Sequence, residues 1–280
     1  MASDLTLLGV DFTSAPTRRK PVTVARGRAA GGVLRLEGLA ACERCADFEA
    51  VLAAPGPWLG AFDFPFGLPR AFVDDLGLGR TAAAVSAALH ARCADRMAFR
   101  ALVDAWGGTR PPGQRLPHRA TDRALAGVTS TSPLQTRYVP VGFMYFEGFA
   151  RLLAAGVHLP GLHRGDPARV ALEGYPGALA HALIGRRSYK NHDGDDRLIA
   201  RKDLVHALEQ GRAADAPRLK LTHAQHDALV ADASGDRLDA VLCLVQAAWA
   251  AAQPDFGLPP QVDPVEGWIT GARPPAGGGT

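Results

Sequence analysis

The chain has no long hydrophobic run, and this absence excludes a membrane-spanning helix. Within its 280 residues no apolar stretch approaches the ~20 residues that a helix needs to cross a bilayer. We therefore expect no membrane association. The first residues, MASDLTLLGV, contain neither a basic leader nor a cleavage signature, so we expect them to be the true N-terminus.

Cysteine is also scarce. Four cysteines are too few for a disulfide framework and indicate a reducing compartment, so we expect a cytoplasmic protein. Cys42 and Cys45 form a C-x-x-C pair, but Cys93 and Cys243 stand far from it, whereas a structural zinc site needs four grouped ligands. We interpret all four as reduced thiols. The nine histidines include no H-E-x-x-H motif, so a metalloprotease-type zinc site is not indicated either.

A strong charge of either sign is missing as well. The net charge of +3 and the pI near 8.8 permit nucleic-acid binding without demanding it. Basic and aromatic residues do not alternate in the way that marks a single-strand stacking platform. One basic stretch could contact phosphates, although an ordinary solvated sheet edge explains it equally well; it comprises Arg18, Arg19, Lys20, Arg26 and Arg28.

The apolar patterning that is present predicts an α/β protein. Residues 5–12 form a continuous apolar run ending in an acid, which is typical of a buried central strand. Residues 20–28 and 31–39 predict two further strands joined by a glycine turn, so the protein should begin with three antiparallel strands. A helix over 45–54 followed by a strand over 57–65 implies a parallel crossover.

The rest of the chain is richer in predicted helices. Helical patterning covers most of 71–106 and returns at 143–156. A strand running into a helix is predicted over 169–185, and a capping box starts another helix at Thr222. The last long helix is expected over 236–253, with a short closing strand at 265–270. Residues 188–196 are predicted to be a polar loop, and the tail 271–280 to be disordered. We expect a single domain over 1–270.

Four carboxylates occupy positions at the ends of these apolar elements. Asp11 and Asp63 end two predicted strands, the latter wedged between Phe62 and Phe64, and Glu173 ends a third. Asp239 lies in the first turns of the last helix, which is apolar on nearly every side. An unpaired buried carboxylate is costly, so each of these acids needs a partner, a proton or a metal.

Each acid also has an ordinary explanation. Asp11 could accept hydrogen bonds from the hydroxyls of the TSAPT turn, and Asp63 could accept them from backbone amides. Glu173 could pair with Arg169 or another arginine, and Asp239 could be stabilised by the helix N-terminus. Four such coincidences together are less expected than one common cause. Converging carboxylates repel one another, and a hard divalent cation such as Mg²⁺ or Mn²⁺ removes the conflict.

The order of the motifs GVDF, FDFPFGLP, RATD, EGYPGAL, YK, DRLDAVLC and EGWI resembles the DUF429 family, over about residues 7–270. That family is described as predicted nucleases with an RNase H-like fold. The resemblance implies a mixed five-stranded sheet with the first three strands antiparallel and helices on both faces. It also implies that 71–165 is a largely helical insertion between the fourth and fifth core strands.

The resemblance further implies a set of site residues. Asp11, Asp63 and Asp239 would converge on metal, with Glu173 as an added ligand or a water-orienting base. Lys190 would stabilise charge on a phosphoryl oxygen. The family pattern also carries Tyr189, as a substrate-binding residue, and Arg119 with Asp122; Arg119 could anchor a phosphate or could simply pair with Asp122 across one helical turn.

Three functions agree with this sequence to different degrees. The leading hypothesis is a Mg²⁺- or Mn²⁺-dependent nuclease that hydrolyses phosphodiester bonds of DNA or RNA. A second is a non-catalytic nucleic-acid-binding or scaffold protein on the same fold. A third, an actin-like ATP phosphotransferase, needs a glycine-rich phosphate loop after the first strand, and the segment DFTSAPT contains no glycine.

Overall fold

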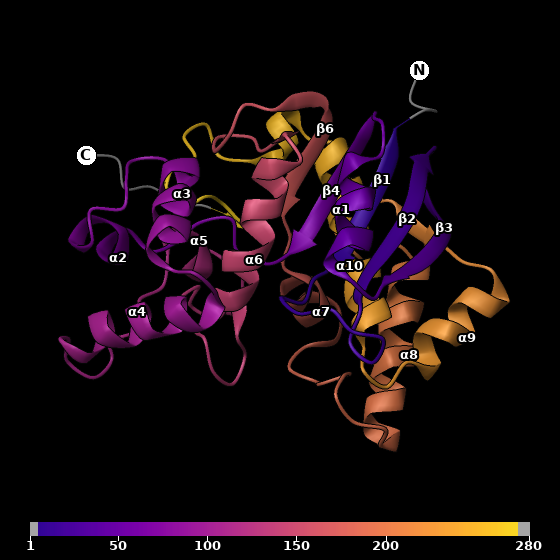
Figure 1. Cartoon of the computed structure of the whole chain (residues 1–280). Helices are drawn as coiled ribbons and strands as arrows, with labels where there is room; N and C mark the ends of the chain where they lie inside the picture. The colour runs from indigo at the N-terminus through magenta and orange to yellow at the C-terminus, as the bar shows by residue number, and fades with distance from the viewer. Residues whose placement is uncertain (1–4, 274–280) are drawn as a thin grey trace, which may run out of the picture.

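The computed structural model of the chain describes residues 5–273, in which one mixed sheet is covered by helices (Figure 1). The strands are β1 (Thr6–Asp11), β2 (Val22–Ala30), β3 (Val33–Cys42), β4 (Trp58–Asp63), β5 (Val157–His158), β6 (Asp166–Glu173) and β7 (Arg218–Lys220). The helices are α1 (Cys45–Ala53), α2 (Arg70–Asp75), α3 (Ala82–Arg92), α4 (Arg96–Gly108), α5 (Ala120–Arg123), α6 (Val141–Ala154), α7 (Pro176–Ile184), α8 (Asp195–Glu209), α9 (His223–Ala231), α10 (Asp236–Ala251) and the 3₁₀ helix η1 (Pro254–Gly257).

The sheet joins an antiparallel start to a parallel second half. Across the described residues its strand order is β5-β6-β4-β1-β2-β3-β7. β1, β2 and β3 pair antiparallel in succession, whereas β4 pairs parallel with β1 and β6 pairs parallel with β4. Gly31 and Gly32 form the β2–β3 turn with φ of 56° and 76°. Two positive φ values are what a type I′ hairpin turn requires, and glycine adopts them without strain. The predicted antiparallel start and the parallel crossover are confirmed.

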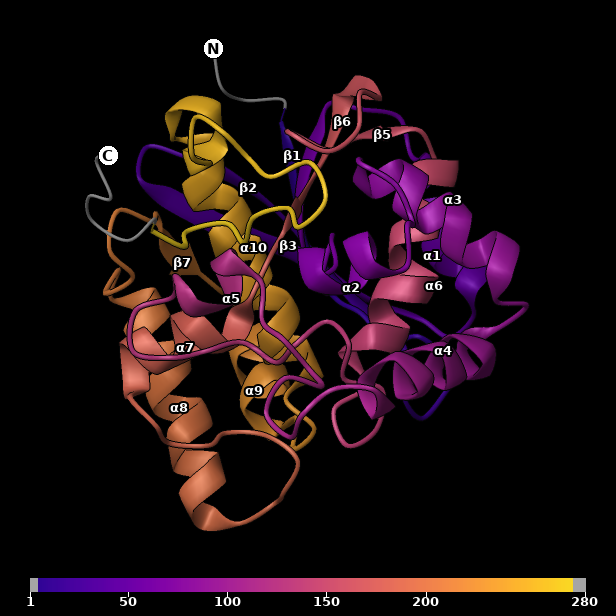
Figure 2. The same ribbon diagram turned by 90° about the vertical axis from the view of Figure 1, so that its left-hand side faces the viewer.

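Strand alternation divides the apolar residues between two helical layers, which Figure 2 shows on either side of the sheet. Leu8, Val10 and Phe62 point to the layer that contains α1 and α6. Leu7 and Ala61, one residue away along the same strands, point to the layer that contains α10, α7 and α8. Each layer is a separate buried core, so the central strands are apolar on both faces, as expected for strands covered on both sides.

Helix α10 lies unusually close to the centre of the sheet, and a glycine permits it. A Cβ atom at Gly9 would lie 2.0 Å from the carbonyl oxygen of Ala240 and 2.1 Å from the nitrogen of Leu244, both in α10. No side chain larger than hydrogen fits at Gly9 unless the helix moves away. The glycine of the GVD sequence therefore determines how closely α10 approaches β1, and with it the position of Asp239.

Some sequence predictions need correction. The sheet has seven strands in the described residues rather than five, because the short strands β5 and β7 extend its two edges. The predicted closing strand at 265–270 makes only one parallel bridge, from Ile269 to Glu173. The polar loop predicted at 188–196 ends earlier, since α8 begins at Asp195. Helix α6 begins at Val141, close to the predicted start.

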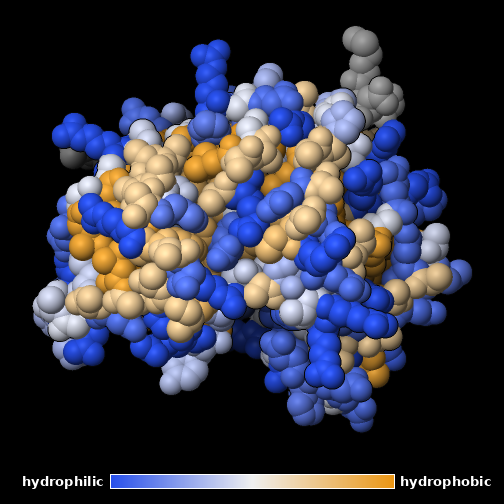
Figure 3. Space-filling model, viewed as in Figure 1, coloured by the Kyte–Doolittle hydropathy of each residue, from blue (hydrophilic) through white to orange (hydrophobic). Residues whose placement is uncertain are grey.

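The chain ends and the surface also bear on the sequence predictions. The first four residues and residues 274–280, which include most of the tail expected to be disordered over 271–280, lie outside the described residues. For residues 271–273 the expected disorder is wrong, because Ala272 is buried and the backbone nitrogen of Arg273 donates a hydrogen bond to the carbonyl oxygen of Ala124. Within the described part of the chain, no helix has the length and apolar character needed to cross a bilayer. On the face shown in Figure 3, the region over α8 and α9 is mostly hydrophilic.

Candidate metal centre and its surroundings

Two of the four predicted acids lie side by side because of strand register. Asp11 and Asp63 are the last residues of β1 and β4, and the parallel pairing places them directly opposite each other. Neighbouring strands are about 4.8 Å apart, so two carboxylates in this register cannot avoid each other. Alternation along β4 sends Phe62 and Phe64 to the other core and leaves Asp63 on the face that α10 covers. This explains how an acid can stand between two phenylalanines.

The third acid comes from the helix that packs on these strands. Asp239 lies in the first turns of α10, next to Ala240, whose carbonyl oxygen is in contact with Gly9. Asp11, Asp63 and Asp239 each offer a carboxylate oxygen, and these three atoms all lie within 4.8 Å of one another. The predicted convergence of these three residues is therefore present.

The electrostatics of the group are unfavourable for three free carboxylates. No described residue donates a hydrogen bond to Asp11 or Asp63, so the hydroxyl and backbone-amide partners considered above are absent. Burial, followed by the charges of Asp239 and Asp63, raises the pKa of Asp11 well above its ordinary value. Burial and the charge of Asp239 raise the pKa of Asp63 to about 7. In the absence of a metal ion, protons together with the nearby ammonium groups of Lys190 and Lys20 compensate this charge.

Asp239, by contrast, has two partners of its own. The Tyr189 hydroxyl donates a hydrogen bond to one carboxylate oxygen, and the Lys190 ammonium pairs with the other. Burial disfavours the charge of Lys190, but Asp239 and Asp63 outweigh it and raise the lysine's pKa. Burial, then Asp239, raises the pKa of Tyr189 well above its ordinary value. The YK motif therefore lies at the centre, as the resemblance implied.

Two further residues near the centre were not among the site residues expected from the sequence, although Lys20 belongs to the basic stretch noted there. Lys20 forms an ion pair of 2.7 Å with Asp236, which lies one helical turn before Asp239. Arg201, in α8, is fully buried and donates hydrogen bonds to the carbonyl oxygens of Tyr189 (3.1 Å) and Val230 (2.7 Å). It thereby holds the backbone of the YK loop.

A sequence signal for Arg201 was available. Leu198, Leu204 and Val205 stand three and four positions away from it and mark the apolar face of α8. An arginine on such a face must be buried and bonded to something.

Glu173 lies outside the group of three. Its carboxylate accepts hydrogen bonds from the Arg119 guanidinium at 2.5 and 2.9 Å and from the backbone nitrogen of Phe66 at 2.9 Å. Arg119 is 1% exposed and also binds Asp122 at 2.8 Å, so the pairing of Arg119 with Asp122 is present. Burial raises the pKa of Glu173 despite the arginine. The arginine partner of Glu173 is thus Arg119 and not Arg169, which pairs with Asp166.

This network of hydrogen bonds around Arg119 holds the loop that follows Asp63 in place. Glu173 ends β6, Phe66 lies three residues after Asp63, and the Arg119 side chain also donates to the backbone oxygen of Glu266. With both carboxylates bound and almost no exposed surface, Arg119 has no donor directed at solvent. The network fixes four separate segments around the end of β4.

The donor set of the centre fits a hard divalent cation. Carboxylate oxygens are the ligands that Mg²⁺ and Mn²⁺ prefer, and two or three of them suffice when water and phosphate complete the shell. Asp11 and Asp63 accept no hydrogen bond from any described residue, which leaves their oxygens available. Among the described residues this is the group whose geometry suits a metal ion.

Fold and centre together define an α/β protein with a mixed sheet and an acidic centre at the carboxyl ends of its parallel strands. A comparison with protein-family models matches residues 9–262 to the family described as "Protein of unknown function (DUF429)". The chain belongs to the DUF429 family, as the motifs indicated. No curated protein and no solved structure matched the chain.

Proposed function

We propose that this protein is a Mg²⁺- or Mn²⁺-dependent hydrolase of phosphodiester bonds, a nuclease acting on DNA or RNA. The observation that carries the proposal is the convergence of Asp11, Asp63 and Asp239, with one oxygen of each within 4.8 Å of the others. Asp11 and Asp63 have no hydrogen-bond donor among residues 5–273, and both have raised pKa values. A divalent cation would relieve that repulsion.

The topology supports an RNase H-like fold for this proposal. The order β3-β2-β1-β4-β6, with the first three strands antiparallel, is the arrangement that the family resemblance implies. In this proposal β5 and β7 are additions to the sheet edges. The segment 71–165, which contains α3 to α6, β5 and all of α2 except its first residue, is then the insertion between the fourth and fifth core strands.

The chemistry assigns distinct tasks to the residues of the centre. A bound divalent ion would lower the pKa of an attacking water and stabilise the leaving oxygen. Asp11, Asp63 and Asp239 would hold it. Lys190, already at the centre, would supply positive charge to a phosphoryl oxygen once the ion takes over its partner Asp239. Tyr189 would keep Asp239 oriented. Glu173 and Arg119 would hold the loop after Asp63 rather than contact phosphate.

Metal-dependent cleavage of single- and double-stranded DNA and RNA by the pure protein tests this function. Asp11→Asn and Asp63→Asn should each reduce the cleavage rate at least about 100-fold, because losing a ligand weakens several kcal/mol of charge stabilisation. Asp74→Asn, at an exposed position on α2, is the matched control and should cleave at the wild-type rate. Unchanged metal-dependent cleavage by Asp11→Asn would refute the proposal.

One observation favours the non-catalytic alternative, a nucleic-acid-binding or scaffold protein. Lys190 and Lys20 already place positive charges beside Asp239 and Asp236, so the protein compensates part of the acidic charge without metal. Lys190→Met separates the two functions. If Asp239 is a ligand, removing the competing ammonium should leave Mn²⁺ binding as tight as before or tighter, while cleavage falls. If the lysine replaces the metal, the wild type should not bind Mn²⁺ in calorimetry, and only the variant, which has lost the ammonium, could bind it.

A further inference from the structure

A cleft lined by arginines adjoins the acidic centre. It has a volume of about 490 Å³ and lies between the β1–β2 loop, the carboxyl end of β3 and the α9–α10 connection. Arg18, Arg19 and Arg237 contribute side chains to it from two separate segments. The volume is in the range of pockets that bind small molecules.

The cleft is joined to the centre through two of its lining residues. Thr23 is the register partner of Asp11 in the β1–β2 pair, and opposite residues of an antiparallel pair point to the same face. Asp236 lies one helical turn before Asp239, on the same side of α10. A ligand bound at Asp11 and Asp239 would therefore continue into the cleft without leaving the protein surface.

The cleft offers positive charge although it also contains two carboxylates. Asp236 is paired with Lys20 at 2.7 Å. Asp232 accepts hydrogen bonds from Ser234 and from the backbone nitrogen of Arg237, which leave its single negative charge against the three arginines of the cleft. In the described residues no carboxylate forms an ion pair with Arg18, Arg19 or Arg237, and all three side chains are exposed. Arg237 donates one hydrogen bond to the carbonyl oxygen of Ala228 at 3.4 Å, and its remaining donors, with those of Arg18 and Arg19, are available to an anion.

We propose that this cleft binds the backbone phosphates of a single-stranded polynucleotide next to the phosphate held at the acidic centre. The inference rests on the proposed function and adds a substrate class to it: a strand, rather than a nucleotide or a small phosphoester. Arginine forks match phosphate geometry, and successive phosphates of one strand extend away from the reacting one. None of the described residues that line the cleft is aromatic, so bases do not stack there; the strand is held through its phosphates, and binding depends strongly on salt.

The salt dependence makes a quantitative test possible. The slope of log affinity against log salt concentration is about −0.7 for each phosphate neutralised on a single strand. Replacing all three arginines by glutamine should therefore reduce the slope by about 2 and weaken binding more than about tenfold at moderate salt. The measurement uses Asp63→Asn full-length protein with chelator, so that neither cleavage nor metal contributes.

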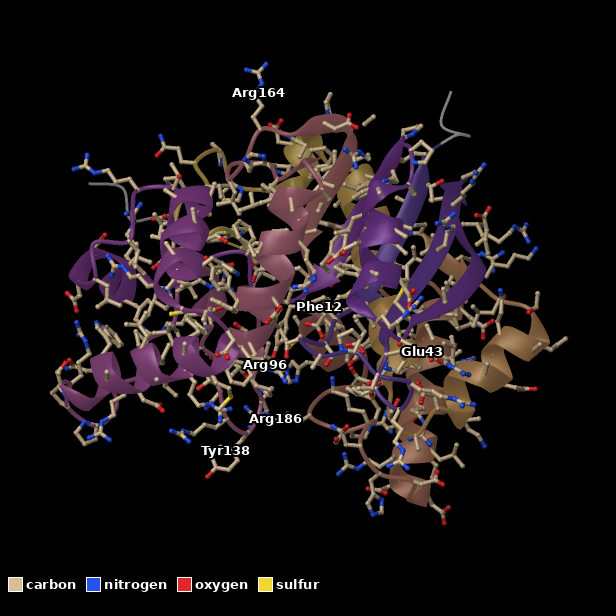
Figure 4. The ribbon with its side chains drawn as sticks, viewed as in Figure 1. Phe12, Glu43, Arg96, Tyr138, Arg164 and Arg186 are labelled. Atoms are coloured by element: carbon tan, nitrogen blue, oxygen red, sulfur yellow. The ribbon has the colours of Figure 1, made fainter. Side chains whose placement is uncertain are left out.

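A charge-matched control carries glutamine at three exposed arginines elsewhere, Arg80, Arg115 and Arg164. Arg164 lies at the upper edge of the molecule in Figure 4, far from Phe12, which follows Asp11, and from Glu43, which follows β3. This control should bind fluorescent single-stranded DNA or RNA with the affinity and salt slope of the parent. Equal weakening in both triple variants would overturn the proposal, because net charge alone would then explain the effect.

Competing ligands distinguish the substrate class. Unlabelled single strands, DNA or RNA, should displace the probe at lower concentration than a duplex of the same length or a nucleoside triphosphate. A triphosphate or a duplex that competes equally well would refute the assignment to a single strand. The proposed function and this inference can fail separately. If the wild type does not cleave but still binds single strands through the cleft arginines, the proposed nuclease function is wrong and the strand-binding inference is supported.

Discussion

The raised pKa of Asp63 predicts that the metal-free protein loses stability as the pH rises from about 4 to about 7. Burial and the charge of Asp239 raise this pKa from an ordinary value of 3.8 to about 7. The folded protein therefore holds a proton on Asp63 that the unfolded chain releases near pH 4. Because the folded state binds more protons, the free energy of unfolding falls with pH between those two values.

The size of this effect follows from the same two values. Each tenfold change in an ionisation constant corresponds to 1.36 kcal/mol, so the difference between 3.8 and about 7 amounts to about 4 kcal/mol. Asp63 retains some exposure to water, which lessens the penalty, and about 4 kcal/mol is an upper limit. Asp11, whose pKa is raised for the same reasons, changes stability in the same direction.

Urea unfolding of wild type and Asp63→Asn in chelator, at pH values from 4 to 8, measures the effect. The two proteins should be of similar stability near pH 4, and the variant should be more stable by up to about 4 kcal/mol at pH 8. Adding Mn²⁺ at pH 8 should stabilise the wild type and leave the variant much less changed. Asp74→Asn should follow the wild-type pH curve. A wild-type stability that stays level or rises relative to Asp63→Asn between pH 5 and 8 would refute the reasoning.

Three further substitutions test how the centre is built. Gly9→Ala should push α10 away from β1, lower the free energy of unfolding by about 1–3 kcal/mol in thermal unfolding and abolish Mn²⁺ binding. Its control is Gly38→Ala, where a Cβ meets no atom within 4 Å; this variant should keep wild-type stability and Mn²⁺ binding. Arg119→Met should cost about 3–5 kcal/mol in urea unfolding because it leaves two buried carboxylates unpaired, and Arg169→Met, at a partly exposed ion pair, at most about 1 kcal/mol. Arg201→Met should release the YK loop, seen as faster proteolytic cleavage within 188–194 at pH 7; a cleavage rate equal to wild type would contradict its role in holding that loop.

Much of the architecture could be predicted from local sequence patterns. The continuous apolar run ending at Asp11, the glycine turn after β2 and the helical spacing of 45–54 each concern neighbouring residues, and the structure confirms all three. The short strands β5 and β7 could not be predicted in this way. Two or three residues carry no measurable periodicity, and these strands form only because the sheet offers an edge to pair with.

In the candidate site, too, the local features could be predicted from the sequence and the long-range contacts could not. The sequence predicts that Asp11 and Asp63 end strands and that Asp239 lies near the start of a helix, because an acid beside an apolar run is a local signal. The same signal at Glu173 predicted a fourth member, but the residue that decides its environment, Arg119, is 54 positions away in the chain. No local pattern indicates which of the 31 basic residues will approach a given carboxylate.

The sequence by itself determined the central strands and the longer helices, where their acids stand and to which family the chain belongs, since these depend on residue type and spacing along the chain. Only the tertiary structure decided which acids meet. Parallel register set Asp11 against Asp63, and the bare backbone of Gly9 let α10 bring Asp239 to them. Glu173 instead forms an ion pair with the buried Arg119, because a buried charge pairs with the opposite charge that packing brings close to it.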